Sequence, residues 1–192
     1  MKIFQFKIQL SYTNNPVVWR RVLVPGDITF NDLHLVIQAA FGWGNSHMYQ
    51  FSLKGWGFKP CYQPLGRYSE YNEDVIDSED TLISDVFKKA RQKYTYIYDF
   101  GDNWTHEILL EKIPEEGLIN PLCIDGQGAC PPEDCGGVHG YYNMVDTINN
   151  PEHPDHYEMA EWMGIPEGKK WDVNAFDQQA ANNRCVALAS AD

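Results

Sequence analysis

The chain has 192 residues, of which 43% are hydrophobic and 14% aromatic, and its formal net charge is −12. This composition excludes an intrinsically disordered chain, and the length predicts a single domain spanning residues 1–192. The acidic balance argues against nucleic-acid binding by the protein as a whole. The opening sequence MKIFQFKIQL lacks the apolar run of a signal peptide or membrane span, so we expect a soluble, cytoplasmic protein with no membrane partner.

The first third of the chain is predicted to form two strands, a helix and a further strand. Residues 2–10 alternate apolar and polar side chains, as expected of a half-buried strand. A second strand is predicted over 17–24, and a helix with a threonine N-cap over 29–41. In the next predicted strand, at 46–54, His47 lies on an aromatic face and is interpreted as a packing residue.

The remaining two thirds are predicted to contain a hairpin and several helices. Irregular segments are expected near 55–80 and 114–137, because both are rich in Gly and Pro and lack periodicity. The other predicted elements are a short helix near 81–90, strands at 93–99 and 104–113 joined as a hairpin, and helices at 138–149, 155–163 and 173–189. This order predicts an α+β fold with an antiparallel or mixed sheet, helices packed on it and a mainly helical C-terminal part.

The first candidate site is the segment from Tyr98 to His106, with the sequence YDFGDNWTH. One interpretation is a tight hairpin turn, since Gly101 permits positive φ and Asp and Asn side chains bond their own backbone. In the other interpretation, Asp99, Asp102 and His106 form a carboxylate and imidazole group at a sheet edge, suited to proton transfer or metal binding.

The second candidate site is a cysteine-rich loop. Three of the five cysteines fall within thirteen residues, which in a reducing compartment points to a metal or a reactive thiol before a disulfide. The candidate ligands of a tetrahedral zinc site are Cys123, Cys130, Cys135 and His139. Alternatively, Cys135 is a nucleophile at a helix N-terminus, with His106 or His139 as its base. In the plainest interpretation Asp134 caps the helix and the cysteines are small buried residues.

A hydrolase-like enzyme is possible if the acidic residues of both segments act together with an imidazole. The candidate catalytic residues are Asp102, His106, Glu133 and Asp134. Two prolines precede Glu133 and hold it and Asp134 in an extended presentation. This hypothesis requires that the hairpin turn and the Pro-Pro-Glu-Asp segment meet as neighbours across a shared cavity.

Three stretches together resemble the plasmid open-reading-frame-three-like family, first named from a root-inducing plasmid. They are Leu33-His34 with Gly42-Trp43 and His47, Tyr98 to His106, and Ala129 to Gly137 with Gly140-Tyr141; the later Glu161-Trp162 and Phe176 extend the match along the chain. The resemblance implies a compact α+β domain of undetermined function. It carries over no catalytic residue.

Three functional hypotheses follow from these observations. The favoured one is a binding or interaction module with an aromatic groove as its working surface, stapled by metal at the Cys123–Cys135 loop. The alternative is the uncharacterised hydrolase described above. The third is weak nucleic-acid association through residues 1–67, which hold seven Lys and Arg against two Asp.

Overall fold

The computed structural model describes residues 2–66, 75–115, 117 and 120–188. The predicted irregular segments near 55–80 and 114–137 therefore lie partly outside the described residues. None of the helices in the described part of the chain is long and apolar enough to cross a membrane.

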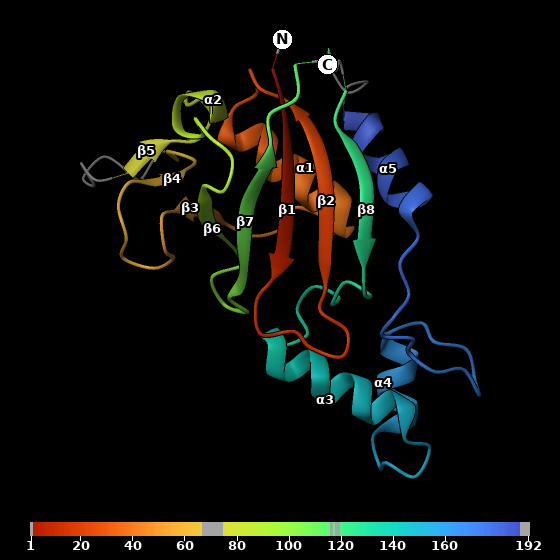
Figure 1. Cartoon of the computed structure of the whole chain (residues 1–192). Coiled ribbons are helices and arrows are strands. Elements are labelled where there is room, and N and C mark those ends of the chain that lie inside the picture. Colours follow the sequence, from red (N-terminus) through yellow and green to blue (C-terminus); the bar gives the residue numbers. More distant parts are fainter. Residues whose placement is uncertain (1, 67–74, 116, 118–119, 189–192) are drawn as a thin grey trace.

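The described strands form one eight-stranded sheet in the order β5-β4-β3-β6-β7-β1-β2-β8 (Figure 1). Its strands are β1 (Ile3–Leu10), β2 (Trp19–Pro25), β3 (Tyr49–Ser52), β4 (Cys61–Gln63), β5 (Val75–Asp77), β6 (Lys93–Tyr98), β7 (Trp104–Lys112) and β8 (Leu122–Gln127). Among these pairs, β4 and β5 run parallel and the others antiparallel. The predicted α+β fold with a mixed sheet is confirmed.

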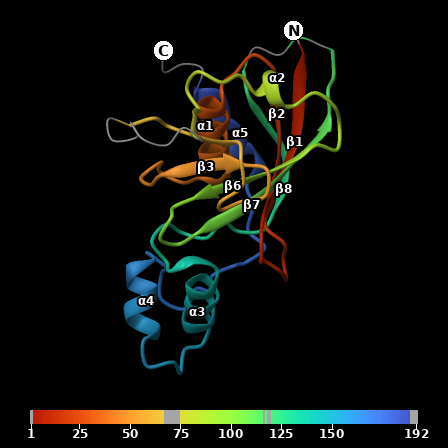
Figure 2. The same cartoon turned by 90° about the vertical axis from the view of Figure 1, so that its left-hand side faces the viewer.

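Two helices cover one face of the sheet, and two others lie beyond its end. The helices are α1 (Phe30–Phe41), α2 (Ile83–Val86), α3 (Gly137–Asn149), α4 (His156–Trp162) and α5 (Gln178–Ala187). Helix α1 packs behind the central strands and α5 beside the edge strand β8, whereas α3 and α4 lie together below the end where β2 begins (Figures 1 and 2). The chain returns from α4 to the sheet through α5, which packs beside β8.

Local signals in the sequence determine helix α1. The Thr29 side chain accepts a hydrogen bond from the Asp32 amide, and the Asp32 side chain accepts one from the Thr29 amide, which completes a capping box. Gly42 ends the helix in the left-handed conformation, with φ of 94°. The helix buries Phe30, Leu33 and other residues at helical spacing against the sheet. The predicted helix over 29–41 is confirmed.

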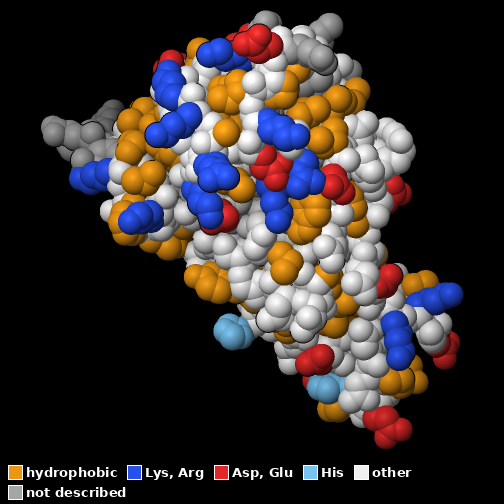
Figure 3. Space-filling view, viewed as in Figure 1, with side chains coloured by type: hydrophobic (Ala, Val, Ile, Leu, Met, Phe, Trp, Pro, Cys, Tyr) orange, Lys and Arg blue, Asp and Glu red, His pale blue; other side chains and the backbone are white. Residues whose placement is uncertain are grey.

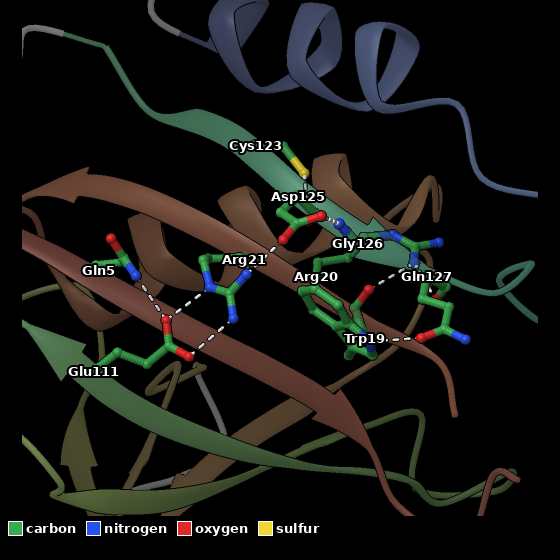
Figure 4. A network of polar contacts seen from close by, with 9 residues as sticks. All are labelled: Gln5, Trp19, Arg20, Arg21, Glu111, Cys123, Asp125, Gly126 and Gln127. Carbon is green, nitrogen blue, oxygen red and sulfur yellow. Dashed lines mark hydrogen bonds and ion pairs between the residues drawn. The ribbon is translucent and has the colours of Figure 1, made fainter. Parts of the chain in front are cut away.

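The other face of the central strands is polar and carries no described helix. Figure 3 shows Lys and Arg side chains gathered on this face, interspersed with Asp and Glu. Arg21 of β2 donates to Glu111 Oε2 at 2.8 Å and also pairs with Asp125, and Gln5 donates to the same Glu111 oxygen (Figure 4). Hydrogen bonds from Arg21 lower the pKa of Glu111, so this part of the basic N-terminal third is matched by acidic side chains.

Three strands and one helix boundary differ from the sequence prediction. Strands β4, β5 and β8 lie in segments expected to be irregular. The first two have three residues each, too few for a detectable alternation, and β8 is held by pairing with β2, about a hundred residues earlier. Helix α5 begins at Gln178 rather than near residue 173, because the Asp177 side chain caps it.

Candidate functional site

The turn between β6 and β7 holds a buried carboxylate in a fixed orientation. Asp99 and Asn103 both adopt positive φ, 55° and 57°, which Asp and Asn tolerate better than most residues. Asp99 Oδ1 accepts hydrogen bonds from the amides of Gly101 at 2.9 Å and Asp102 at 3.3 Å. The second oxygen, Oδ2, remains directed toward His47, at 3.7 Å from its Nε2.

The loop between Cys130 and α3 is fastened directly to this turn. Asp102 Oδ2 accepts a hydrogen bond from the Gly136 amide at 3.0 Å, and Tyr98 Oη donates to Glu133 Oε1 at 2.5 Å. The same Glu133 oxygen accepts from the Gly44 amide at 3.1 Å. The two candidate segments are therefore neighbours in direct contact, and the shared cavity expected between them stays a prediction.

A glycine makes this contact possible. Gly137 adopts φ of +67°, and a Cβ atom there would lie 2.5 Å from the backbone oxygen of Asp102. Any other residue would separate the loop from the turn, because real Cβ atoms do not approach a carbonyl so closely. The glycine pair that follows Cys135 therefore sets how closely the two segments pack.

His47 completes a group of three metal-binding side chains. Its Nε2 lies 3.2 Å from Asp134 Oδ1 and 3.7 Å from Asp99 Oδ2, and all three ligand atoms lie within 4.8 Å of one another. In the described parts of the chain this is the one such group of three or more His, Cys, Asp or Glu side chains. Nε2 itself is buried and makes no hydrogen bond of acceptable geometry. The nitrogen and the two oxygens thus face a common space rather than satisfying one another.

The arrangement matches the needs of a divalent cation. One imidazole and two carboxylates form a nitrogen and oxygen donor set that suits Zn²⁺ or Mn²⁺. Metal–ligand bonds of about 2.1 Å place neighbouring ligand atoms roughly 3–4 Å apart, close to the separations found here. The Asp134 side chain is 71% exposed and that of Asp99 10%, so the group is anchored on one side and open to solvent on the other.

The ligand atoms of the predicted zinc site do not converge in the described part of the chain. Cys123 belongs to β8, where its amide donates to Asn182 Oδ1 of α5, whereas Cys135 lies just before the N-cap of α3. The sulfurs and the exposed His139 are not among the described groups whose ligand atoms converge. Burial raises the pKa of both Cys130 and Cys135 to about 12, and the carboxylates of Asp102 and Asp134 contribute to the rise at Cys135. Both thiols are therefore protonated at neutral pH, which argues against a nucleophilic Cys135.

The structure places His106 in the hydrophobic core, away from the other candidate catalytic residues. Its ring meets the rings of Phe41 and Trp43 edge-on, at centroid distances of 5.0 and 5.4 Å. Burial lowers its pKa to about 3. Strand alternation explains the position, because His106 shares the inward face of β7 with Trp104 and Ile108. His106 is thus unavailable for proton transfer to a ligand, while Asp102, Glu133 and Asp134 lie at the junction.

His47 is the residue that sequence reasoning missed. The sequence predicts a packing residue because His47 alternates onto the aromatic face of the predicted strand at 46–54. In the structure β3 pairs with β6, with Tyr49 opposite Tyr98, so the residues just before β3 lie beside those just after β6. This pairing is the signal that would have linked His47 to Asp99.

An exposed aromatic pair joins this turn, through Phe100, to the segment between β3 and β4, through Trp56. Trp56 and Phe100 are 48% and 39% exposed, and their rings meet edge-on at 4.8 Å. Trp56 Nε1 donates to Asn103 Oδ1 at 2.9 Å, which fixes the indole against the turn.

Comparison with known proteins identifies the family of this chain and two proteins similar to it. Residues 2–180 match the family model described as plasmid pRiA4b ORF-3-like protein. The chain belongs to this family. An uncharacterised protein of Sinorhizobium fredii is 36% identical over 182 residues, which cover 94% of this chain and 86% of that protein. A crystal structure of a protein of unknown function from Methanosarcina mazei Go1 is 31% identical, with a TM-score of 0.76, covering 93% of this chain and 96% of that one. The first of these proteins is described as uncharacterised and the second as of unknown function.

Proposed function

We propose that this protein is a binding module whose working surface is organised by a divalent metal ion held by His47, Asp99 and Asp134. The observation that carries the proposal is the convergence of three ligand atoms within 4.8 Å, one of them a buried imidazole nitrogen without an aligned hydrogen-bond partner. Two carboxylates facing each other repel, and a bound divalent cation removes that repulsion.

The ion would staple the cysteine-rich loop to the sheet. Asp134 belongs to that loop, Asp99 to the β6–β7 turn and His47 to the segment before β3, so one ion joins three segments far apart in the sequence. A metal staple was expected in this loop with sulfur ligands. Nitrogen and oxygen ligands fulfil the same role in this proposal, while the cysteines pack as small buried residues.

The surface beside the proposed metal suits a ligand or partner with an oxygen donor and an apolar group. Three protein ligands leave coordination positions open on a divalent ion, and the exposed Asp134 side faces solvent. Trp56 is held against Phe100 and Asn103 of the turn that carries Asp99, and this pair of rings provides apolar surface with fixed geometry. Exposed aromatic residues of this kind anchor binding interfaces.

Metal-assisted hydrolysis is the second candidate, favoured by the same open coordination positions and by the carboxylates of Asp102 and Glu133 nearby. Both carboxylates are already engaged, Asp102 with the Gly136 amide and Glu133 with Tyr98 and Gly44. These contacts give both carboxylates a structural role in joining the loop to the sheet, while the second oxygen of each is left to accept a proton.

The test is metal titration of protein purified without a histidine tag and stripped with a chelator. We expect one equivalent of Zn²⁺ or Mn²⁺ to bind. At a free metal concentration a hundred times Kd, binding should add about 2.7 kcal/mol to the free energy of unfolding and so raise the melting temperature. His47→Gln and Asp99→Asn should each weaken binding by roughly tenfold or more, as loss of a direct ligand requires. His139→Gln, an exposed histidine of α3, is the matched control and should bind as the wild type does.

Two results would count against the proposal. Substoichiometric binding with unchanged melting would remove the metal centre. Equal affinity in His47→Gln and the wild type, combined with loss of binding in Cys130→Ser, would move the ion back to the cysteine residues. Turnover of a phosphate or carboxylate ester by the metal-loaded protein, abolished by Glu133→Gln, would favour the hydrolase instead.

A further inference from the structure

A second cavity, of about 340 Å³, lies between the sheet and the segment that leads into α5. It is separate from the proposed metal centre and shares no residue with it. Its volume lies at the lower end of the range for small-molecule sites. The basic and aromatic side chains that line it are Arg20, Lys170, Trp171, Phe176 and Arg184, together with Phe41.

Arg20 brings a buried positive charge to this cavity. It is 2% exposed and lies on the opposite side of β2 from Arg21 (Figure 4). Its guanidinium stacks on Phe176 at 4.2 Å and faces Phe41 at 5.1 Å. Among the described residues no carboxylate oxygen lies within 4.0 Å of it; its neighbours are backbone carbonyls.

One N–H group of the Arg20 guanidinium is left without a hydrogen-bond partner among the described residues. Four of its five N–H groups bond to the carbonyls of Trp19, Ala40, Gln127 and Gly128. The fifth, on Nη2, has no partner in the part of the chain that the structure describes. The side chain is therefore held rigidly and keeps one charge-assisted donor for a ligand.

The other charges around the cavity leave a positive excess. Arg184 of α5 donates its Nε to Ala39 at 2.7 Å, and its terminal nitrogens pair with none of the described carboxylates. Asp172 and Asp177 also line the cavity and accept hydrogen bonds from the amides of Asn174 and Ala180, so its lining side chains carry three positive charges against two negative ones. The C-terminus of α1 offers only about half a negative charge against the two guanidinium groups.

We infer that this cavity binds a small organic anion, a carboxylate or phosphate monoester that carries a planar apolar group. The anionic end meets Arg20 and Arg184, where guanidinium geometry favours planar or tetrahedral oxyanions. The apolar end lies against Trp171 and Ile165. This role is independent of the metal centre, because none of the ligands of that centre lines the cavity.

Isothermal titration with three probes of similar size tests the inference. The probes are phenyl phosphate, phenylacetate and the uncharged benzyl alcohol, each at constant ionic strength. We expect saturable one-to-one binding of at least one anion and none of benzyl alcohol. The anion that binds more tightly identifies the preferred headgroup.

Variants locate the binding. Arg184→Gln should weaken it by roughly tenfold, as expected for loss of a charge-assisted contact, and Lys170→Gln by less. Arg91→Gln, on the polar face of the sheet, changes net charge equally and should leave affinity unchanged. His47→Gln should also bind normally. Two results would overturn the inference. One is that neither anion saturates the protein up to about 10 mM, since a specific site should bind more tightly than that. The other is equal affinity in Arg184→Gln and Arg91→Gln.

Discussion

His106 offers a direct test of how burial governs the stability of this fold. The residue is 0% exposed, and neither ring nitrogen makes a hydrogen bond of acceptable geometry. Its pKa falls from 6.5 to about 3 because burial penalises the charged ring. A lowered pKa means that the unfolded chain takes up the proton first, so stability is complete above pH 6.5 and is lost as pH falls from 6.5 toward 3.

The magnitude follows from these two pKa values. Between pH 7 and pH 5 the linkage relation gives a loss of about 2 kcal/mol from His106 alone. His106→Leu removes this titration. At pH 7 we expect the substitution to change the free energy of unfolding by less than about 2 kcal/mol. Removing two buried nitrogens without partners stabilises the fold, whereas losing the ring contacts destabilises it.

Urea denaturation at pH 7 and pH 5 measures the effect. The variant should lose about 2 kcal/mol less than the wild type between the two pH values. His34 is a useful comparison, because it is also buried with a pKa lowered to about 4 but bonds to Tyr96 and Asn45. His34→Leu should flatten the pH dependence similarly yet cost more at pH 7. Parallel pH dependence in the wild type and His106→Leu would falsify the burial argument.

Three further changes test the local geometry. Gly137→Ala should lower the free energy of unfolding by at least about 2 kcal/mol in urea denaturation, because it adds a 2.5 Å clash with the Asp102 backbone to a strained φ. Gly57→Ala, with positive φ but no close neighbour, should cost less, and equal losses in the two variants would refute the clash. Gly126→Ala should lower stability by about 1–3 kcal/mol, since an aromatic ring lies 2.7 Å from the added Cβ; a neutral melting curve would show that the ring moves freely. Thr29→Ala should cost about 1 kcal/mol through loss of the N-cap, and no change in melting temperature would contradict that.

The elements that the sequence predicted well are those with local signals. Helix α1 has a cap, an apolar stripe and a glycine stop within its own residues, and β1 alternates cleanly over eight residues. Strands β4 and β5 escaped prediction because their stability comes from pairing within the sheet rather than from their own composition. The same applies to β8, whose Asp-Gly-Gln sequence is typical of a loop.

The sequence predicted the two segments of the candidate site separately. The Asp99–His106 turn and the Pro-Pro-Glu-Asp loop were both singled out, and the structure brings them into contact. The sequence pointed to His106 as the imidazole of the site, whereas the structure places His47 there. Only the pairing of β3 with β6 brings His47 to Asp99. The cysteines are close in sequence, but β8 directs Cys123 toward α5 and separates it from the start of α3.

The position of β1 within the sheet has a consequence for the newly made chain. Strand β1 lies between β2 and β7, yet β7 begins only at Trp104. At translation rates of about 5–20 residues per second, one edge of β1 waits roughly 5–20 s before its second neighbour emerges from the ribosome. During that interval the nascent protein exposes an unpaired apolar strand, which is the form of polypeptide that chaperones shield from aggregation.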